Sequence, residues 1–161
     1  MPEGVLKTMD VPLRLSGLGA SIQELLDVYK KQVLCVLEMA APAWASALSK
    51  SDKRNIERVQ KCALSIILGS NYHCYENALS VLNLKRLDDR RINLCEKFAV
   101  KASKNDQHKN WFCLAEQSEP VNTRSEKPVL KYKEPKTRTG RFANSPIPYL
   151  TKLLNEKHAK T

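Results

Sequence analysis

The sequence predicts an all-α protein, a small bundle of about four helices with a disordered basic C-terminal tail. Apolar residues recur at helical spacing between residues 21 and 102, and no convincing strand-like alternation occurs before residue 105. After residue 105 the helical repeat is lost. Residues 115 to 146 mix charged, Ser, Thr and Pro residues with few apolar side chains, a composition that buries too little surface to offset the entropy of ordering.

The sequence divides into four predicted segments. Residues 1–19 form an irregular N-terminal segment, residues 20–112 a helical domain, residues 113–143 a disordered basic linker, and residues 144–161 a short C-terminal docking segment. The chain has 161 residues, of which 42% are hydrophobic, so one ordinary core is the expected size.

The first helix is predicted from Ser21 to about Ala40. Ser21 and Glu24 have the spacing of a capping box, and Pro42 removes a backbone donor, so the chain must bend there. The alanines around Pro42 allow close packing at this corner. Glu38, near the end of the helix, is expected either to pair with a cation of the second helix or to face solvent.

Three more helices follow. Ser49 and Ser51 both suit the N-cap of a second helix and Asp52 suits its first turn, and Gly69 can end this helix in a left-handed conformation. A short third helix is expected at about residues 75–82, and a fourth from about residue 87 to residue 102. The predicted core is Leu25, Leu26, Tyr29, Val33, Trp44, Val59, Ile66, Leu94 and Phe98.

Charge and cysteine content limit the class of protein. The net charge of +10 indicates a polyanionic partner, although an acidic protein fits the same field. No run is long enough to span a membrane and no signal peptide is evident, so we expect an intracellular protein of the nucleus or cytoplasm. Five cysteines without a short repeated spacing make a disulfide framework improbable, and three are expected on apolar helical faces.

Few residue patterns suggest catalysis. Asp88 and Asp89 resemble a metal-binding acid pair, but they fall in the first turn of a helical pattern, where acids favour the helix dipole. His73, Cys74 and the stretch 108–113 lack the spacing of a zinc site. We therefore predict no catalytic residue, no metal, no cofactor and no small-molecule substrate.

The basic residues are the candidate binding site. Some lie on the outer face of the second helix, others near the start of the fourth helix, and the rest in the tail. The candidates are Arg54, Arg58, Lys61, Lys85, Arg86, Arg90, Arg91, Lys131, Lys133, Lys136, Arg138 and Arg141. The alternatives are a solvated helix face, ion pairs of Arg90 and Arg91 with Asp88, Glu96 or another acid, and a tail that binds nothing specific.

The order of motifs gives a resemblance. Six short motifs follow one another along the chain. They are Val36-Leu37-Glu38 with Pro42 and Trp44, Ile56-Glu57-Arg58-Val59-Gln60-Lys61, Ile66-Ile67-Leu68-Gly69, Tyr75-Glu76, Arg90-Arg91 and Asn144-Ser-Pro-Ile-Pro-Tyr-Leu-Thr-Lys-Leu-Leu-Asn155. The series resembles the region just after the polymerase domain in jockey-like reverse transcriptases of non-long-terminal-repeat retrotransposons. It covers about residues 13–112 and 141–155; residues 1–12 depart from it.

The resemblance implies a helical, thumb-like segment of an RNA-directed DNA polymerase that contacts template and primer. The aromatic-x-Asp-Asp signature of the polymerase palm is absent from the sequence, so we expect no polymerase activity. The expected function is non-catalytic binding of RNA or an RNA–DNA hybrid by phosphate contacts, with the palm of the parent protein as a further partner. The alternatives are a protein-interaction remnant that packs on a missing palm, or a fragment without selected function.

Overall fold

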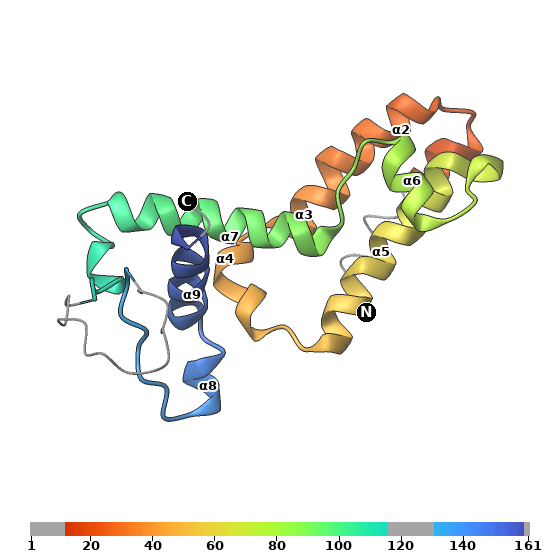
Figure 1. Cartoon of the computed structure of the whole chain (residues 1–161). Coiled ribbons are helices and arrows are strands. Elements are labelled where there is room, and N and C mark those ends of the chain that lie inside the picture. The colour runs from red at the N-terminus through yellow and green to blue at the C-terminus, as the bar shows by residue number, and fades with distance from the viewer. Residues whose placement is uncertain (1–11, 116–130, 160–161) are drawn as a thin grey trace. The chain divides into compact units, whose positions relative to one another are not determined.

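The computed structural model describes residues 12–115 and 131–159, and this part of the chain is all-α (Figure 1). The longer helices are α2 (Ile22–Val28), α5 (Lys50–Leu68), α6 (Tyr75–Val81), α7 (Leu87–Lys104) and α9 (Pro146–His158). Within the described ranges the β-type pairing consists of one isolated antiparallel bridge, between Leu114 and Tyr132. The predicted all-α class is confirmed.

Two compact units make up the chain. The first unit comprises Met1–Ala41 and Leu48–Arg91, and the second unit comprises Pro42–Ala47 and Ile92–Thr161. Residues 20–112, predicted to form one domain, are distributed between both units. The reason is that Ala45 and Cys95 belong to a second core, built with residues of the C-terminal helix.

The first unit starts with consecutive helical segments, one of which is π-helical. Residues 12–17, inside the segment predicted as irregular, are helical, and residues 1–11 of that segment lie outside the described residues. Helix α2 is continued by a wider π-helical stretch (Tyr29–Leu34) and by α3 (Cys35–Glu38). The predicted capping box is confirmed: the Ser21 hydroxyl accepts from the Glu24 amide at 3.4 Å, and the Glu24 carboxylate accepts from the Ser21 amide at 2.8 Å.

The corner around Pro42 is formed by a residue with positive φ. Helix α3 ends at Glu38, and Ala40 has φ 52°, a left-handed conformation that interrupts the helical path. Pro42 then lies near the start of the short helix α4 (Ala41–Trp44), where its missing N–H leaves no helical bond unmade. The predicted break in the helix near Pro42 is present, and the residue with positive φ lies two positions before the proline.

Helix α5 is the central element of the first unit, and α2 and α6 both contact it (Figure 1). Asp52 and Ser49 form a second capping box, in which the Ser49 hydroxyl accepts from the Asp52 amide at 3.1 Å. Gly69, with φ 52°, ends the helix as predicted. The inner face buries Val59, Ala63, Leu64, Ile67 and Leu68 against the apolar residues of α2, the π-helical stretch and α6.

The second unit is built on the later part of α7 and on α9. Its core consists of Ala45, Cys95, Ala99, Ala102, Phe112, Leu150, Leu153 and Leu154. Trp44, expected in the core, is only partly buried, against this second cluster. Phe98 was also expected to be buried, but its side chain is 39% exposed, because Cys95, Ala99 and Ala102 form the inner face of α7 here.

The structure describes part of the predicted linker and most of the predicted C-terminal docking segment. Of residues 113–143, residues 116–130 lie outside the described residues; Leu114 pairs with Tyr132, and the short helix α8 (Gly140–Ala143) follows. Helix α9 occupies the range predicted as a C-terminal docking segment, and Leu150, Leu153 and Leu154 on it are buried in the second core. Residues 160 and 161 lie outside the described range.

Candidate nucleic-acid interface

The outer side of α5 carries a row of exposed cations, which we call the α5 basic face: Lys50, Arg54, Arg58 and Lys61. At 3.6 residues per turn these four residues fall within about 80° of the helix circumference. The two acids of α5 do not offset them on this face, because Asp52 is bonded to Ser49 at the N-terminus and Glu57 is buried. Three of the four residues were predicted from the sequence.

Lys50 is the fourth cation of the α5 basic face and was not among the residues predicted from the sequence. It lies one turn before Arg54, so the i, i+4 spacing could have included it. From the sequence, Ser51 and Ser49 are equally suitable N-caps, and a helix that starts after Ser51 would not include Lys50. The capping box formed by Ser49 decides between the two serines and makes Lys50 the first helical residue.

A buried polar network supports the base of this face. The Tyr75 hydroxyl donates to the Glu57 carboxylate and lies 2.9 Å from Gln60 Oε1, while Gln60 Nε2 donates to the Lys85 carbonyl at 3.2 Å. Burial, reinforced by the bond to Glu57, raises the pKa of the Tyr75 phenol, so the ring stays neutral. Lys61 Nζ lies 5.0 Å from the centroid of the same ring, at a distance suited to a cation–π contact.

The cations just before α7 are more accessible to solvent than those within its first turns. Lys85 is exposed, and the side chain of Arg86 is half-exposed with its Nε 3.7 Å from Glu57 and its Nη1 3.6 Å from Glu76. Arg86 thus balances the buried Glu57 while keeping solvent access.

The side chains of Arg90 and Arg91 point into the first unit instead. Arg90 donates two hydrogen bonds to Glu38, one of them from Nη2 at 3.0 Å, and these bonds raise the pKa of its guanidinium. Arg91 is 3% exposed and pairs with Asp88. Of the partners left open by the sequence, Asp88 is correct for Arg91. Arg90 pairs with another acid, Glu38, which the prediction for Arg90 allowed. Glu38 itself was expected to pair with a cation of the second helix or to face solvent, and it pairs with a cation of α7 instead. We therefore leave Arg90 and Arg91 out of the candidate phosphate contacts.

Asp88 and Asp89 occupy the first turn of α7, as predicted. There they lie near the positive end of the helix dipole, and Asp88 also neutralises Arg91. In residues 12–115 and 131–159 no three side chains among His, Cys, Asp and Glu converge as a metal site would require. Three of the five cysteines were expected on apolar helical faces, but Cys95 alone is buried, and Cys35, Cys62, Cys74 and Cys113 are exposed.

The candidate cations of the tail lie in the second unit. Lys131, Lys133, Lys136, Arg138 and Arg141 are all exposed. The first two flank Tyr132, whose amide donates to Asn155 Oδ1 at 3.0 Å and whose carbonyl accepts from Asn155 Nδ2 at 3.0 Å. This part of the tail is therefore attached to α9, and its cations have defined positions.

No helix in the described part of the chain is long and apolar enough to cross a membrane. In comparisons with known proteins, no family model, curated protein or solved structure matched the sequence or the fold. The resemblance to jockey-like reverse transcriptases therefore rests on the motifs themselves and is carried forward as part of the proposal below.

Proposed function

We propose that this chain is a non-catalytic nucleic-acid-binding protein, the thumb-like post-polymerase region of a jockey-like reverse transcriptase, acting in the nucleus or cytoplasm. The observation that supports it is the α5 basic face. Four exposed cations share one side of a helix whose acids are buried or used in a cap. The thumb-like segment corresponds to the helices of the first unit, α2, α5, α6 and the start of α7.

The dimensions of the α5 basic face suit a nucleic-acid backbone. Lys50 and Lys61 are separated by eleven residues in the helix, or about 16 Å at 1.5 Å per residue. This length corresponds to about five base pairs of duplex at 3.4 Å each. Lysine and arginine bound to phosphates carry no base information, so the binding should depend weakly on sequence.

The ligand we propose is RNA or an RNA–DNA hybrid, as the resemblance implies. The contacts assigned to it are the α5 basic face, Lys85, Arg86 and the five exposed tail cations. Arg90 and Arg91 are excluded because they pair with Glu38 and Asp88 and their side chains are only 33% and 4% exposed, whereas the side chain of Arg86 is 50% exposed. The positive field of the whole chain, with a net charge of +10, adds a contribution that draws any polyanion at low salt.

The test is a salt titration of hybrid binding between about 50 and 200 mM, with two double variants. Arg54→Ala with Arg58→Ala removes two cations of the α5 basic face and should flatten the log–log slope by about 1.8. Lys30→Ala with Lys31→Ala removes the same charge from exposed positions of the π-helical stretch of the first unit and should leave the slope nearly unchanged. Equal flattening in both would show a diffuse field and no localised site.

The tail contribution is best measured by point substitution. Deleting the chain after Asn105 would remove α9, and with it Leu150, Leu153 and Leu154 from the second core, so loss of binding could reflect unfolding. Lys133→Ala with Arg138→Ala leaves the core in place and should also flatten the slope by about 1.8 if both residues contact phosphate. Absence of hybrid binding by the unmodified chain at low salt would refute the proposal.

A second candidate is the protein-interaction remnant, which an exposed apolar patch would favour. Leu13, Leu18 and Ile22 are 58%, 82% and 43% exposed and lie close together in sequence at the start of the described first unit. Such side chains mark a contact surface when they gather. In this alternative they pack on the polymerase palm, and Leu18→Asp would abolish that association without changing the salt slope of hybrid binding.

A further inference from the structure

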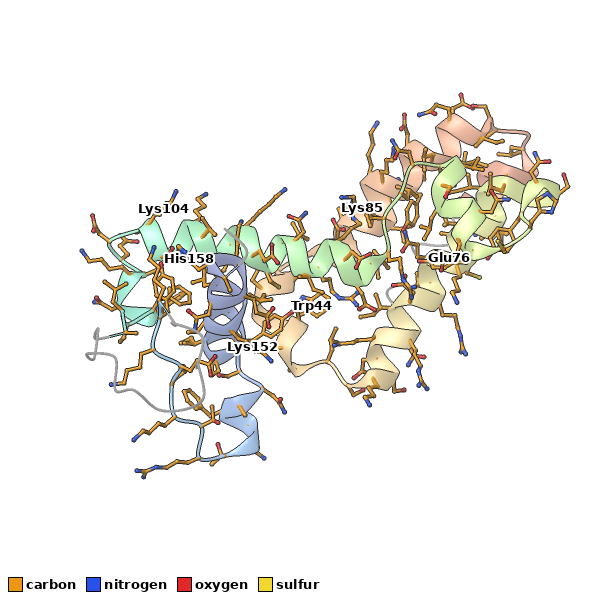
Figure 2. All side chains as sticks on the ribbon, in the orientation of Figure 1. Trp44, Glu76, Lys85, Lys104, Lys152 and His158 are labelled. Atoms are coloured by element: carbon orange, nitrogen blue, oxygen red, sulfur yellow. The ribbon has the colours of Figure 1, made fainter. Side chains whose placement is uncertain are left out.

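A cavity of about 300 Å³ lies in the second unit, at the C-terminal ends of α7 and α9. Lys104 and His158, both labelled in Figure 2, line it from the last turns of these two helices. Lys131 and Tyr132 line it from the segment that pairs with Leu114, and Lys157 completes the basic rim. The candidate residues predicted from sequence included Lys131 alone among these.

Side-chain contacts hold this cavity in shape. Asn155 brackets the backbone of Tyr132 with one accepted and one donated hydrogen bond, both 3.0 Å long. Lys131 Nζ lies 2.9 Å from His158 Nε2, and the ring of Tyr132 packs edge-on to Phe112 with centroids 6.2 Å apart. A cavity positioned by such bonds is already formed before a ligand arrives.

The electrical character of the cavity is positive. Three lysines line it, and no carboxylate is among its described lining residues. Lys104 and Lys157 also interact favourably with the ends of helices α7 and α9, as cations in a last turn commonly do. The helix dipole does not account for Lys131 or the Tyr132 ring, because both come from a segment outside any helix.

The interior of the cavity is apolar, whereas its rim is charged. Val100 and Leu154 contribute aliphatic side chains beside the half-buried Tyr132 ring. An aromatic face next to cations is the combination that binds a base by stacking and its phosphate by charge. The volume is at the lower end of the range of about 300–1000 Å³ for ligand pockets, which suits a single nucleotide.

We propose that this cavity binds one nucleotide of a single strand, with the base against Tyr132 and the phosphate between Lys104, Lys131 and Lys157. The inference takes its ligand class from the proposed function, and its geometry from the second unit alone. It adds a specific single-strand subsite to the backbone contacts proposed for the α5 basic face.

The test uses the full chain and three probes, adenosine 5′-monophosphate, inorganic phosphate and adenosine, titrated by calorimetry and by amide chemical-shift changes. The monophosphate should bind at least about tenfold more tightly than either of the other two, because only it engages both the ring and the cations. Equal binding of inorganic phosphate would overturn the nucleotide assignment. Absence of monophosphate binding at millimolar concentration would overturn the site.

Matched variants locate the binding. Lys104→Gln with Lys157→Gln should weaken monophosphate binding about tenfold or more, since two charge-assisted contacts are lost. Lys101→Gln with Lys152→Gln changes exposed residues of the same two helices that do not line this cavity, and should leave binding unchanged. Tyr132→Leu should reduce the affinity for the monophosphate to that for inorganic phosphate. Unchanged binding in the Lys104, Lys157 variant would contradict the proposal.

The two proposals fail separately. Hybrid binding that persists in the Lys104, Lys157 variant, with no monophosphate bound by the parent chain, refutes the subsite and leaves the function of the α5 basic face standing. Monophosphate binding without hybrid binding refutes the proposed function and supports the cavity as a nucleotide site. The thermal midpoint of each variant controls for unfolding.

Discussion

Glu38 accepts two hydrogen bonds from the guanidinium of Arg90, which lies 52 residues further along the chain. The pair joins the end of α3 to the start of α7 within the first unit. The exposed fractions of the two side chains are 15% for Glu38 and 33% for Arg90, so water screens the pair only partly. It is therefore a structural contact with a measurable contribution to stability.

We expect a double-mutant cycle on Glu38→Ala and Arg90→Ala to give a coupling energy of about 1–3 kcal/mol. Each single variant should lower the free energy of unfolding, because each leaves the other ionic group without its partner. Denaturant unfolding of the four proteins measures the coupling. A value below about 0.5 kcal/mol would mean that the pair contributes little, as exposed pairs do.

Two arginines of the first unit should behave in opposite ways. Arg58→Ala should flatten the salt slope of hybrid binding by about 0.9 with little change in unfolding, because the side chain is exposed on the α5 basic face. Arg90→Ala should lower stability and leave the slope unchanged. Parallel salt titrations and denaturant curves test both, and a flattened slope for Arg90→Ala would return that residue to the interface.

Two buried tyrosines make a second matched pair. The Tyr29 hydroxyl is buried and has no hydrogen-bond partner among the described residues, whereas the Tyr75 hydroxyl bonds to Glu57. Tyr29→Phe should therefore change the free energy of unfolding by less than about 0.5 kcal/mol or increase it, and Tyr75→Phe should cost about 1–3 kcal/mol. Urea unfolding of the two variants decides, and equal costs would contradict the assigned bonding.

Burial raises the pKa of both Tyr29 and Tyr75 above the ordinary value of 10.0. For a group whose pKa is raised on folding, the stability contribution is present below the ordinary value and is lost as the pH rises towards the folded value. We expect alkaline unfolding to begin above about pH 10, accompanied by late ionisation of two tyrosines. Tyrosinate absorbance measures it; normal titration of all five tyrosines in the folded chain would be the contrary result.

Acid should weaken the two helix caps. The amide of Ser21 lowers the pKa of Glu24, and the hydroxyl of Ser49 lowers that of Asp52, from ordinary values of 4.5 and 3.8. Because both are lowered on folding, their stabilisation is present above the ordinary values and is lost as the pH falls through the folded ones. Asp52→Asn should reduce the pH dependence of the unfolding midpoint between about pH 5 and 2. An unaltered dependence would argue against the cap.

The second core can be tested by contrasting a buried and an exposed side chain. Leu150 is 1% exposed, and Leu150→Ala should cost about 2–5 kcal/mol through lost burial and a cavity. Phe98 is 39% exposed, and Phe98→Ala should cost less than about 1 kcal/mol. Thermal unfolding followed by circular dichroism compares them. A larger loss at Phe98 would restore the core position predicted from the sequence.

Local signals in the sequence were sufficient for much of the first unit. The serine caps, the glycine end of α5 and the buried face with Val59 follow from spacing and backbone chemistry over a few residues. The second core was not predictable in this way. Cys95 and Leu150 lie 55 positions apart in sequence, and only the packing of α9 on α7 shows that Cys95, Ala99 and Ala102 form the inner face there instead of Phe98.

The same distinction holds for the candidate sites. Arg54, Arg58 and Lys61 share one helix, so periodicity alone identifies their common face. Lys104 and His158 line one cavity only because two helix ends lie at it, which no spacing rule indicates. Arg91 was wrongly included among the candidates. Its charge suggested a phosphate contact, but the side chain is buried and pairs with Asp88.

The two hydrogen bonds between the Asn155 side chain and the Tyr132 backbone fix the register of the Tyr132 segment against α9. One side-chain amide offers one acceptor and one donor, and it engages the N–H and the C=O of the same residue, Tyr132. Aspartate has nearly the same shape but lacks the donor, so it could satisfy only one of these two groups. If the segment slipped by one residue, successive side chains would exchange sides and the tyrosine ring would turn away from the cavity. Together with the antiparallel bridge between Leu114 and Tyr132, whose flanking hydrogen bonds are both 2.9 Å long, this one amide on a helix selects which residue of the segment faces the cavity.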